Sequence, residues 1–598
     1  MAAGIHQPYS IVSGAKDALA DLLGFCGNEL PAGILNHVRH VSFDSSSPEG
    51  AALHFPSPLK EQEATAAIKA LEACAIAAMA DLGHGWNTTP RAIHVDMDKV
   101  ACFLMSAYIT TLDGLGKGDA LVKSKIEDTD LNHAQSNMYR RLSANLYVTK
   151  DPGRYYHIHG SLEASTTLTM LGLPPHRPDL TDYKECIKTI EKAVKRFTVT
   201  ELEKLNARHR QAGIEALKWD DFRRTRHGRA LVGLPPFTVD CIEDSTPPVP
   251  FLTHTQDCSR PQVLRGIKVL ELCRVIAGPT IGRSLAANGA LVLKVTSRRL
   301  PDVPFFQLDV NTGKHTTSFD LKDDRDRTIF DQLLADADVL IDGYRPGALA
   351  RLGYGPDHLA SLALSRGKGF VYVAEDCFGG TGISPATYDT QSRLERHSRA
   401  PKFEWSSRPG WQQIADCVTG VAWAQGVFMG LAEPVVPPFP MSDYGTGALG
   451  SLAALTALYN RAVHGGTWVC RTSLCQYDIF LQKLGLYPDH VQDAIRLAHG
   501  GGNISDADGF FALRHADSVD EVGKRAFASM KRVSPRLFGD EMINEAWSEG
   551  FKGVVRWPKE AMKVDGVRIG HVRGSRPNGA DEATWQGWEV DAEIAGQD

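Results

Sequence analysis

An amide and a carboxylate stand four residues apart in WQQIADCVTG, residues 411–420. If this segment is helical, Gln412 and Asp416 lie one turn apart on the same face. Asp416 then has the position of a general base, while Gln412 donates hydrogen bonds to an oxyanion that develops in the reaction. The other interpretation is that Asp416 caps or pairs near a helix terminus, and the residues alone leave both open.

Two histidines alternate in RYYHIHGS, residues 154–161. His157 and His159 are two positions apart on a predicted strand, so their side chains point to the same face. Two histidines on one face can bind a metal, but no third ligand is evident near them in the sequence. We therefore predict a structural or ligand-contacting role for this pair, and no metal site.

The elements that must position these residues belong to several folding units, because 598 residues exceed what one hydrophobic core holds. The clearest break lies at 245–262, where four prolines and several small polar residues interrupt helical and strand periodicity. We place a linker at 251–265, a first unit at 1–250 and a second unit at 266–598.

Apolar runs of strand length alternate with helical segments after the linker. Strands are predicted at 266–272, 290–295, 339–342 and 369–374, and helices at 280–288, 324–337 and 348–352. This repeated βα alternation predicts an α/β fold with a Rossmann-like, doubly wound parallel sheet.

The first unit has a different pattern. Stretches rich in lysine and glutamate at 183–195 and 199–213 predict solvent-facing helices of a smaller α+β domain. A weak repeat is also present, because 64–98 and 447–474 both read as a helix, a glycine turn and a strand.

Five blocks of the second unit resemble the class III CoA-transferases, the family that contains formyl-CoA and carnitine CoA-transferases and alpha-methylacyl-CoA racemase. In chain order, the blocks are 266–295, 311–322, 337–353, 370–379 and 443–461. Five ordered blocks are far more specific than any single glycine motif. The first unit resembles a truncated second copy that lacks the opening sheet, so the whole chain looks like a long fungal tandem member of the family.

The resemblance implies that coenzyme A is bound, as an acyl-CoA substrate, and that no metal takes part. Lys314 in NTGK matches a lysine that contacts the nucleotide, and Arg351 after the RPG turn matches an arginine that reaches CoA. Tyr344 stands where an aromatic residue lies against adenine. Arg298 is the substitute for a family arginine after the second strand, and Ile276 in the IAGP turn completes the predicted binding set.

A plainer interpretation of the same residues is also open. Arg345 and Arg351 are then surface charges near the start of a helix, and Tyr344 is a half-buried packing residue.

The resemblance also locates the catalytic position. In the family, a carboxylate eight residues before a conserved glycine attacks the acyl carbonyl to form a mixed anhydride. Counting back from Gly420 gives Gln412, which is not a carboxylate, so Asp416 becomes the candidate replacement. Asp443 is expected to be structural, at the opening of a helix.

We therefore expect an enzyme that transfers CoA between carboxylic acids, or that moves the α-proton of an acyl-CoA in an isomerisation or racemisation. One alternative is a repurposed fold that catalyses a non-CoA isomerisation, elimination or cyclisation in secondary metabolism. Another is a catalytically inactive family member.

The composition of the chain limits the classes of partner that we expect it to bind. A formal charge of -6 gives no basic field for nucleic acid. Neither a secretory signal nor an apolar stretch of the ~20 residues that cross a bilayer is present, so no membrane partner and a cytoplasmic location are expected. The eleven cysteines have no CxxC or zinc-ligand spacing and are predicted to be reduced. Family resemblance implies a carboxylic acid or acyl-CoA as ligand and a homodimer.

Overall fold

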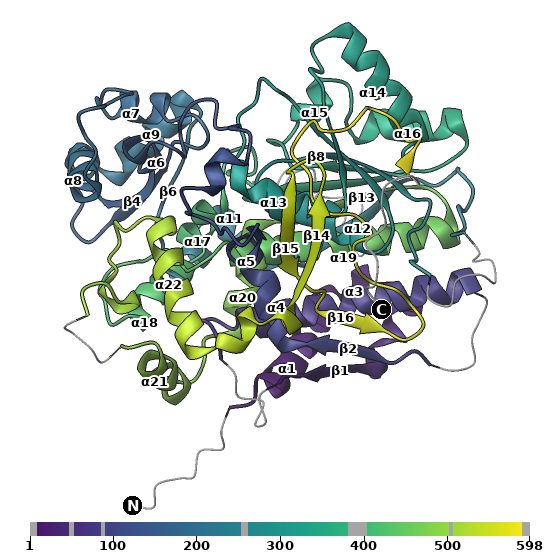
Figure 1. Cartoon of the computed structure of the whole chain (residues 1–598), viewed down its shortest axis with the longest axis horizontal. Helices are drawn as coiled ribbons and strands as arrows, with labels where there is room; N and C mark the ends of the chain where they lie inside the picture. Colours follow the sequence, from purple (N-terminus) through teal and green to yellow (C-terminus); the bar gives the residue numbers. More distant parts are fainter. Residues whose placement is uncertain are drawn as a thin grey trace, which may run out of the picture.

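Seven strands form the largest sheet of this computed structural model (Figure 1), which describes residues 9–46, 53–84, 90–252, 261–380, 403–501 and 506–588. In sheet order they are β10 (His315–Ser318), β9 (Leu291–Thr296), β8 (Lys268–Leu272), β11 (Val339–Asp342), β12 (Val371–Asp376), β13 (Thr467–Ser473) and β7 (Phe237–Glu243). The first six are parallel, and β7 is antiparallel to β13. Numbered along the chain, the parallel strands have the order 3-2-1-4-5-6. This is the Rossmann-like order, so the predicted fold class is confirmed.

Helices cover both faces of this sheet because successive strand residues point to opposite sides. Val269 and Ile341 pack in one core with α12 and α19, whereas Leu270 and Leu340 pack in a second core with α14 and α16. These helices are α12 (Ala277–Ala287), α14 (Asp324–Asp336), α16 (Pro356–Arg366) and α19 (Met441–His464). α12 begins before the predicted 280 because a proline, Pro279, is tolerated in the first helical turn.

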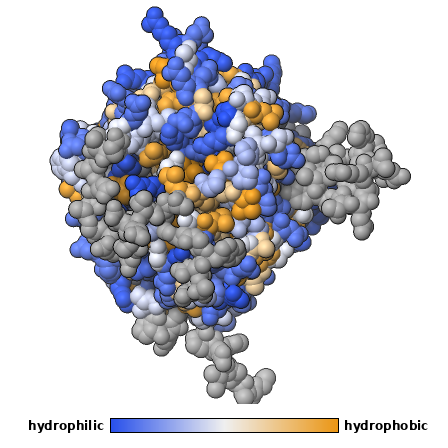
Figure 2. Space-filling model, turned by 90° about the vertical axis from the view of Figure 1, so that its right-hand side faces the viewer, coloured by the Kyte–Doolittle hydropathy of each residue, from blue (hydrophilic) through white to orange (hydrophobic). Residues whose placement is uncertain are grey.

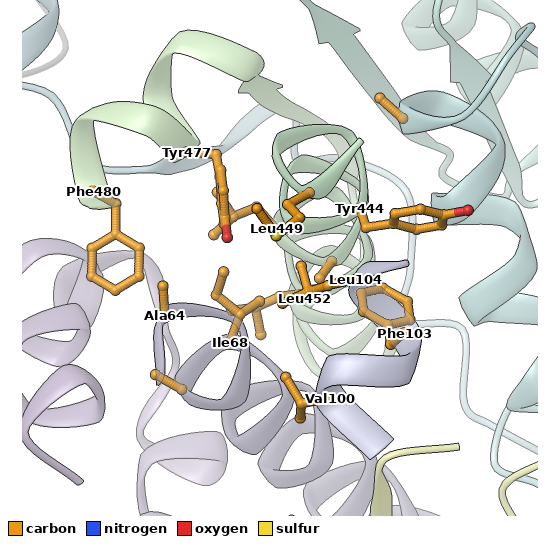
Figure 3. Packing of buried hydrophobic residues seen from close by; sticks show 14 of the residues in the cluster. Ala64, Ile68, Val100, Phe103, Leu104, Tyr444, Leu449, Leu452, Tyr477 and Phe480 are labelled. Atoms are coloured by element: carbon orange, nitrogen blue, oxygen red, sulfur yellow. The ribbon is translucent and has the colours of Figure 1, made fainter. Parts of the chain in front are cut away.

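The N-terminal part repeats one section of the second. Helix α3 (Glu61–His84), β2 (Ile93–Asp96) and α4 (Met97–Leu104) follow one another as α19, β13 and α20 (Leu474–Leu484) do. In Figure 3, Ile68 of α3 and Leu452 of α19 lie in one buried cluster with Val100 and Phe103 of α4. The predicted correspondence between 64–98 and 447–474 therefore falls on two matching sections that pack against each other, as expected for a tandem arrangement.

A smaller α+β group lies at one end of the molecule (Figure 1). Its antiparallel strands are β4 (Ala144–Val148), β5 (Tyr155–His159) and β6 (Ala212–Glu215), and its helices are α7 (Ser165–Met170), α8 (Tyr183–Val194) and α9 (Val199–His209). Helices α8 and α9 correspond to the two predicted solvent-facing helices. The second ends earlier than predicted, because Arg210 adopts a left-handed conformation that closes α9.

The boundary between the two predicted units is crossed by strand pairing. β7 precedes the predicted linker but extends the sheet of the second unit. Conversely, β16 (Met562–Val564) pairs with β2, and β15 (Gly553–Pro558) pairs with both β14 (Ile543–Ser548) and β3 (Thr111–Leu112). The division at 251–265 stays a prediction, and residues 253–260 of that linker lie outside the described residues.

The other elements are mostly short. They include β1 (Val41–Asp44), α1 (Ile11–Cys26), α2 (Ala32–Leu35), α5 (Ser106–Ile109), α6 (Met138–Arg141), α10 (Trp219–Arg224), α11 (Arg226–Val232), α13 (Gln307–Val310), α15 (Ala348–Arg351), α17 (Gln412–Val418), α18 (Val421–Phe428), α21 (Asp489–Ala498) and α22 (Val519–Val533).

None of the described helices is long and apolar enough to cross a membrane. The cysteines within the described ranges are free thiols. The face in Figure 2 is largely hydrophilic, with apolar residues gathered near its centre.

Candidate active site

A cavity of about 480 Å³ lies where three distant parts of the chain meet. Its walls come from residues 108–162 of the N-terminal part, from 275–306 and 411–443, and from 518–520. Val275 and Ile276 follow β8, at the carboxyl edge of the parallel sheet where doubly wound folds bind ligands. The N-terminal part therefore builds one wall of this cavity.

Gln412 lines this cavity and is held by two hydrogen bonds. Its Nε2 donates to Asp416 Oδ2 at 2.9 Å and to the carbonyl of Phe439 at 3.2 Å. A carbonyl only accepts, so the NH₂ group must face Phe439. Both amide protons are then used, which leaves none for the predicted oxyanion.

Asp416 lies behind Gln412, away from the cavity. The helical spacing places the two side chains on one face of α17 as predicted, but Asp416 is fully buried and does not line the cavity. Its Oδ1 accepts a hydrogen bond from Ser442 Oγ at 2.8 Å. Burial, and then the charge of Asp478, raise the pKa of Asp416 well above its usual range. In this geometry Asp416 orients Gln412.

Asp443, in the first turn of α19, is the carboxylate that faces the cavity beside Gln412. None of the described residues forms a hydrogen bond or an ion pair with its carboxyl group. Burial, and then Asp478, raise the pKa of Asp443 to about 7. The sequence suggested a structural residue here, whereas the structure exposes a partnerless acid to the cavity.

Glu375 lies close to Asp443 at the end of β12. Burial raises the pKa of Glu375 well above its usual range, and the charge of Asp443 is the next cause. Glu375 lines a second cavity of about 210 Å³, together with Tyr344 and Arg471. The two acids therefore lie where the cavities approach each other.

Three arginines gather at the carboxyl edge of the sheet. Arg274 follows β8, Arg345 follows β11 and Arg210 comes from the smaller α+β group. Burial, and then the charges of Arg274 and Arg210, lower the pKa of Arg345, so the three lie close together. Within the described parts of the chain, no carboxylate pairs with any of them. β8 and β11 flank the point where the strand order reverses, which is the usual ligand site in such sheets.

Comparison with known proteins places the chain in a family. A profile described as CoA-transferase family III matches residues 264–503. The chain is 32% identical over 575 residues to the acetyl-coenzyme A transferase nodX of Hypoxylon pulicicidum, an alignment that covers 93% of this chain and 90% of that protein. This chain belongs to CoA-transferase family III. It is also 29% identical over 428 residues to an acyl-CoA transferase of Gibberella moniliformis, with 71% of each chain covered.

Solved structures give a weaker likeness. Rv3272 from M. tuberculosis, in its orthorhombic form, has a TM-score of 0.37 and 19% sequence identity, and the alignment covers 54% of this chain and 98% of that one.

Of the five predicted CoA-binding residues of this family III chain, two line a cavity and three do not. Ile276 lines the larger cavity and Tyr344 the smaller one, where the Arg274 guanidinium lies 5.5 Å from the Tyr344 ring centre. Arg298 and Arg351 are exposed and line neither cavity. Lys314 lines neither, because its side chain is fully buried.

Lys314 is one half of a buried ion pair. Its Nζ lies 2.6 Å from Glu271 Oε2 and donates to the carbonyl of Pro279 at 2.7 Å. Both side chains have no exposed surface, and burial lowers the pKa of Lys314 to about 8. The pair joins β8 to the start of α12, which supports the turn that carries Ile276.

Replacing Lys314 with methionine is expected to destabilise the fold by about 3 kcal/mol, because Glu271 would be left buried without a partner. The Km for an acyl-CoA should stay within about twofold, since Lys314 does not reach either cavity. Denaturant unfolding and steady-state kinetics measure the two effects. Adding Glu271→Met to the same chain should recover most of the stability, and a large rise in Km at normal stability would restore Lys314 as a CoA contact.

His159 lies on the cavity wall beside Trp411 and Gln413. Its ring stacks on Trp411 with 5.4 Å between ring centres, and the backbone N–H of Ser161 donates to Nδ1 at 3.0 Å. The proton is therefore on Nε2, which donates to Gln413 Oε1 at 3.3 Å. Burial lowers the pKa of His159 to about 4, so this imidazole is neutral. No group of three or more possible metal ligands occurs within the described ranges.

Sequence reasoning missed Asp443, Arg274 and Arg210 as site residues. The signal for Arg274 was available, because it directly follows the first strand of a doubly wound sheet. No local signal marks Arg210, which reaches the site from a different part of the chain.

Proposed function

We propose that this family III chain transfers CoA between carboxylic acids, with Asp443 as the carboxylate that takes up the acyl group. The observation that carries this proposal is the partnerless carboxyl of Asp443 on the cavity wall beside Gln412. Its pKa, raised to about 7 by burial, keeps a substantial ionised fraction at neutral pH. A poorly solvated carboxylate of this kind is a stronger nucleophile than an exposed one.

The proposed exchange proceeds through the Asp443 carboxylate. One oxygen of Asp443 attacks the thioester carbonyl, the C–S bond breaks, and CoA leaves as the thiolate while a mixed anhydride forms. The incoming acid attacks this anhydride and releases Asp443, which gives an anhydride of the two acids. The CoA thiolate then attacks the carbonyl of the incoming acid, which yields the new thioester and the first acid. Gln412, fixed by Asp416 and Phe439, shapes the wall beside the reacting carboxyl.

Arginines at the sheet edge are the proposed anchor for the CoA phosphates. Among the described residues, neither Arg274 nor Arg345 has an acidic partner, which suits phosphate recognition. Neither lines a cavity, but Arg274 directly precedes Val275 and Ile276 of the larger cavity wall, and the charge of Arg274 acts on Arg345. Tyr344, under Arg274, offers a flat surface for adenine.

Arg274→Ala and Arg345→Ala should each raise the Km for an acyl-CoA about 10-fold to 100-fold, since a hydrogen bond to a charged group contributes about 1.5–3 kcal/mol. The value of kcat should change little, because phosphate contacts are the same before and during the reaction. Arg351→Ala is the matched control, an exposed arginine of α15 that is not among the three arginines clustered at the sheet edge. If only the Arg351 variant raised the Km, CoA would bind as the sequence suggested.

The direct test is incubation with acetyl-CoA and a series of free acids, followed by mass spectrometry of the CoA thioesters. New thioesters should accumulate in the presence of acid and enzyme. A chain that neither binds CoA nor exchanges thioesters would reject the proposed function, in favour of a repurposed or inactive family member.

Proton transfer at the α-carbon of an acyl-CoA is a second candidate. It is favoured by His159 and Asp443, a neutral imidazole and an acid on the walls of one cavity. Deuterium uptake at the α-carbon in D₂O, without a change of thioester, would support this reaction over CoA transfer.

We propose a cytoplasmic protein, as expected from the sequence, and a homodimer, as the family resemblance implies. Sedimentation analysis of the purified chain would measure the assembly.

A further inference from the structure

Part of the cavity wall is apolar, although charged residues such as Lys117, Asp119 and Lys123 stand beside it in the lining. Val122 and Ile126 come from the loop after β3, and Phe305 and Phe306 come from the turn before α13. Val122, Ile126 and Phe305 belong to a buried cluster with Trp557 and other apolar residues. This wall is therefore backed by a packed core and keeps its shape.

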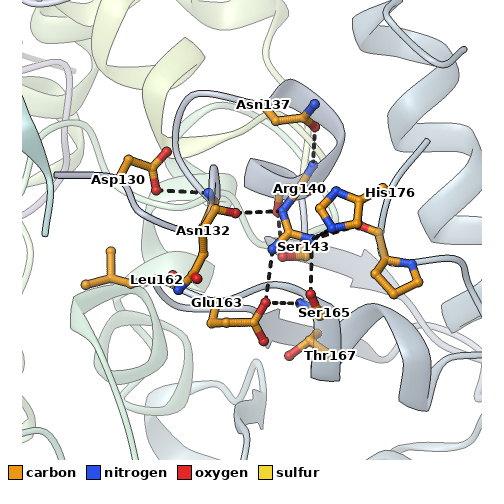
Figure 4. Close-up of polar contacts among 12 residues, drawn as sticks. Asp130, Asn132, Asn137, Arg140, Ser143, Leu162, Glu163, Ser165, Thr167 and His176 are labelled. Carbon is orange, nitrogen blue, oxygen red and sulfur yellow. Dashed lines mark hydrogen bonds and ion pairs between the residues drawn. The ribbon is translucent and has the colours of Figure 1, made fainter. Parts of the chain in front are cut away.

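The loop that carries this wall is also held by polar contacts, several of which Figure 4 shows. Arg140 donates to the carbonyl of Asn132 at 3.0 Å and to Glu163 Oε1 at 3.0 Å. The Asp130 carboxyl accepts backbone N–H groups of Ala134, Gln135 and Ser136 at 2.9, 2.8 and 2.7 Å. The Asp130 carboxyl therefore accepts hydrogen bonds from its own loop and not from a ligand.

The cavity lining carries more carboxylates than cations, because Asp119, Asp128, Asp130, Asp443 and Asp520 lie on the same walls as Lys117, Lys123 and Arg141. Lys117 forms an ion pair with Asp520, and Arg141 lies 3.3 Å from the same carboxyl group. Lys123 is the remaining basic residue of the lining, and its side chain is exposed. The pKa of Asp443 is raised by burial and by Asp478, with no cation among the causes. A second carboxylate at the far end of the substrate would lie against Val122, Ile126 and Phe306 in a lining with an excess of acidic groups, and would lose hydration without a cation of its own.

We infer, on the basis of the proposed CoA transfer, that the acid exchanged at this site is a large, mainly apolar monocarboxylic acid. Its carboxyl end lies at Asp443, and its apolar body fills the space bounded by Val122, Ile126 and Phe306. A volume of about 480 Å³ is in the range of ~300–1,000 Å³ that holds a drug-sized molecule. Formate or acetate, with only a few heavy atoms, would leave most of this volume to water. Each methylene that reaches the wall should raise affinity about fourfold, which corresponds to about 0.8 kcal/mol.

The first experiment compares acetate, butyrate, octanoate, decanoate and succinate as acceptors, with acetyl-CoA as the common donor. We expect kcat/KM to rise steeply from butyrate to decanoate, and succinate to be at least tenfold poorer than butyrate. Efficient exchange with succinate or acetate and none with decanoate would overturn the inference while leaving CoA transfer intact.

A binding measurement tests the inferred class of acid independently of CoA transfer. Decanoyl-CoA should raise the melting temperature of the full chain more than acetyl-CoA or succinyl-CoA at the same concentration. If no acid were exchanged but this order of binding held, CoA transfer would fail and the apolar ligand class would stand. Equal shifts for the three thioesters would reject the ligand class.

Two variants place the ligand in this cavity. Ala144 lies on the wall, so Ala144→Phe should lower kcat/KM for decanoate at least tenfold while acetate changes little. The matched control is Ala335→Phe, on an exposed position of α14, which should leave both unchanged. Phe306→Ala, which removes wall surface without adding bulk, should also weaken the preference for decanoate. Unchanged selectivity in both wall variants would contradict the proposed location.

Discussion

Replacing Asp443 with asparagine is expected to lower kcat for CoA exchange roughly 10³-fold or more, because the change removes the nucleophile and preserves the shape of the side chain. In the unchanged protein, kcat/KM should rise with pH through about 7, as the Asp443 carboxyl ionises. Thioester exchange measured from pH 5 to 9 checks both results. Chemical trapping of the acyl group on Asp443 with hydroxylamine would identify the anhydride directly.

Variants of Asp416 and of an exposed aspartate show whether Asp443 is the reacting carboxylate. Asp416→Asn keeps the cavity wall and should reduce exchange far less than Asp443→Asn, since Asp416 does not line the cavity. Asp324→Asn, in the exposed first turn of α14, is the isosteric control and should have no effect. If the Asp416 variant were inactive and the Asp443 variant active, the carboxylate would be the one suggested by helical spacing.

The sheet was predictable from the sequence because its signal is local. Buried parallel strands are rich in apolar residues, and the run at 339–341, just before Asp342, shows this clearly. The shared face of Gln412 and Asp416 was predictable for the same reason, since helical geometry fixes neighbours four positions apart. Strand β7 was not predictable as a neighbour of β13, because nothing in its own sequence specifies a partner more than two hundred residues away.

The site depended on information that the sequence does not contain. The matched block predicted Lys314 as a ligand contact because its carboxylate partner was not visible in the sequence. Glu271 of β8 becomes that partner only when the turn before β10 folds against β8 and the start of α12. For Asp443 the sequence suggested a structural role, and the lack of a partner became visible only in the folded structure. Its lack of a partner is a property of the folded environment, and that property is what makes it available for chemistry.

Stability is expected to fall as pH rises from about 6.5 to 8, by on the order of 3 kcal/mol. Burial is the main cause that raises the pKa values of Glu61, Asp478 and Asp443 to about 8, 7 and 7. In the unfolded chain these groups titrate near pH 4. Below pH 6.5 buried histidines such as His159 and His227, whose pKa burial lowers to about 4, have the opposite effect, because they bind protons only in the unfolded chain. Between pH 6.5 and 8 the buried carboxyls decide the balance, so raising the pH favours unfolding, and above pH 8 their contribution is lost.

Asp478→Asn should flatten this dependence and raise the melting temperature at pH 8. Asp478 is fully buried, accepts a hydrogen bond from Thr419 Oγ1 at 3.0 Å and contributes to the raised pKa values of both Asp416 and Asp443. Asparagine can still accept this hydrogen bond, while the charge that repels its neighbours is removed. The same substitution should shift the pH profile of exchange to lower pH, because Asp443 then ionises more readily. Thermal melts and pH–rate profiles of the variant would show both changes, whereas an unaltered rate profile would mean that Asp443 is not the group whose ionisation the rate reports.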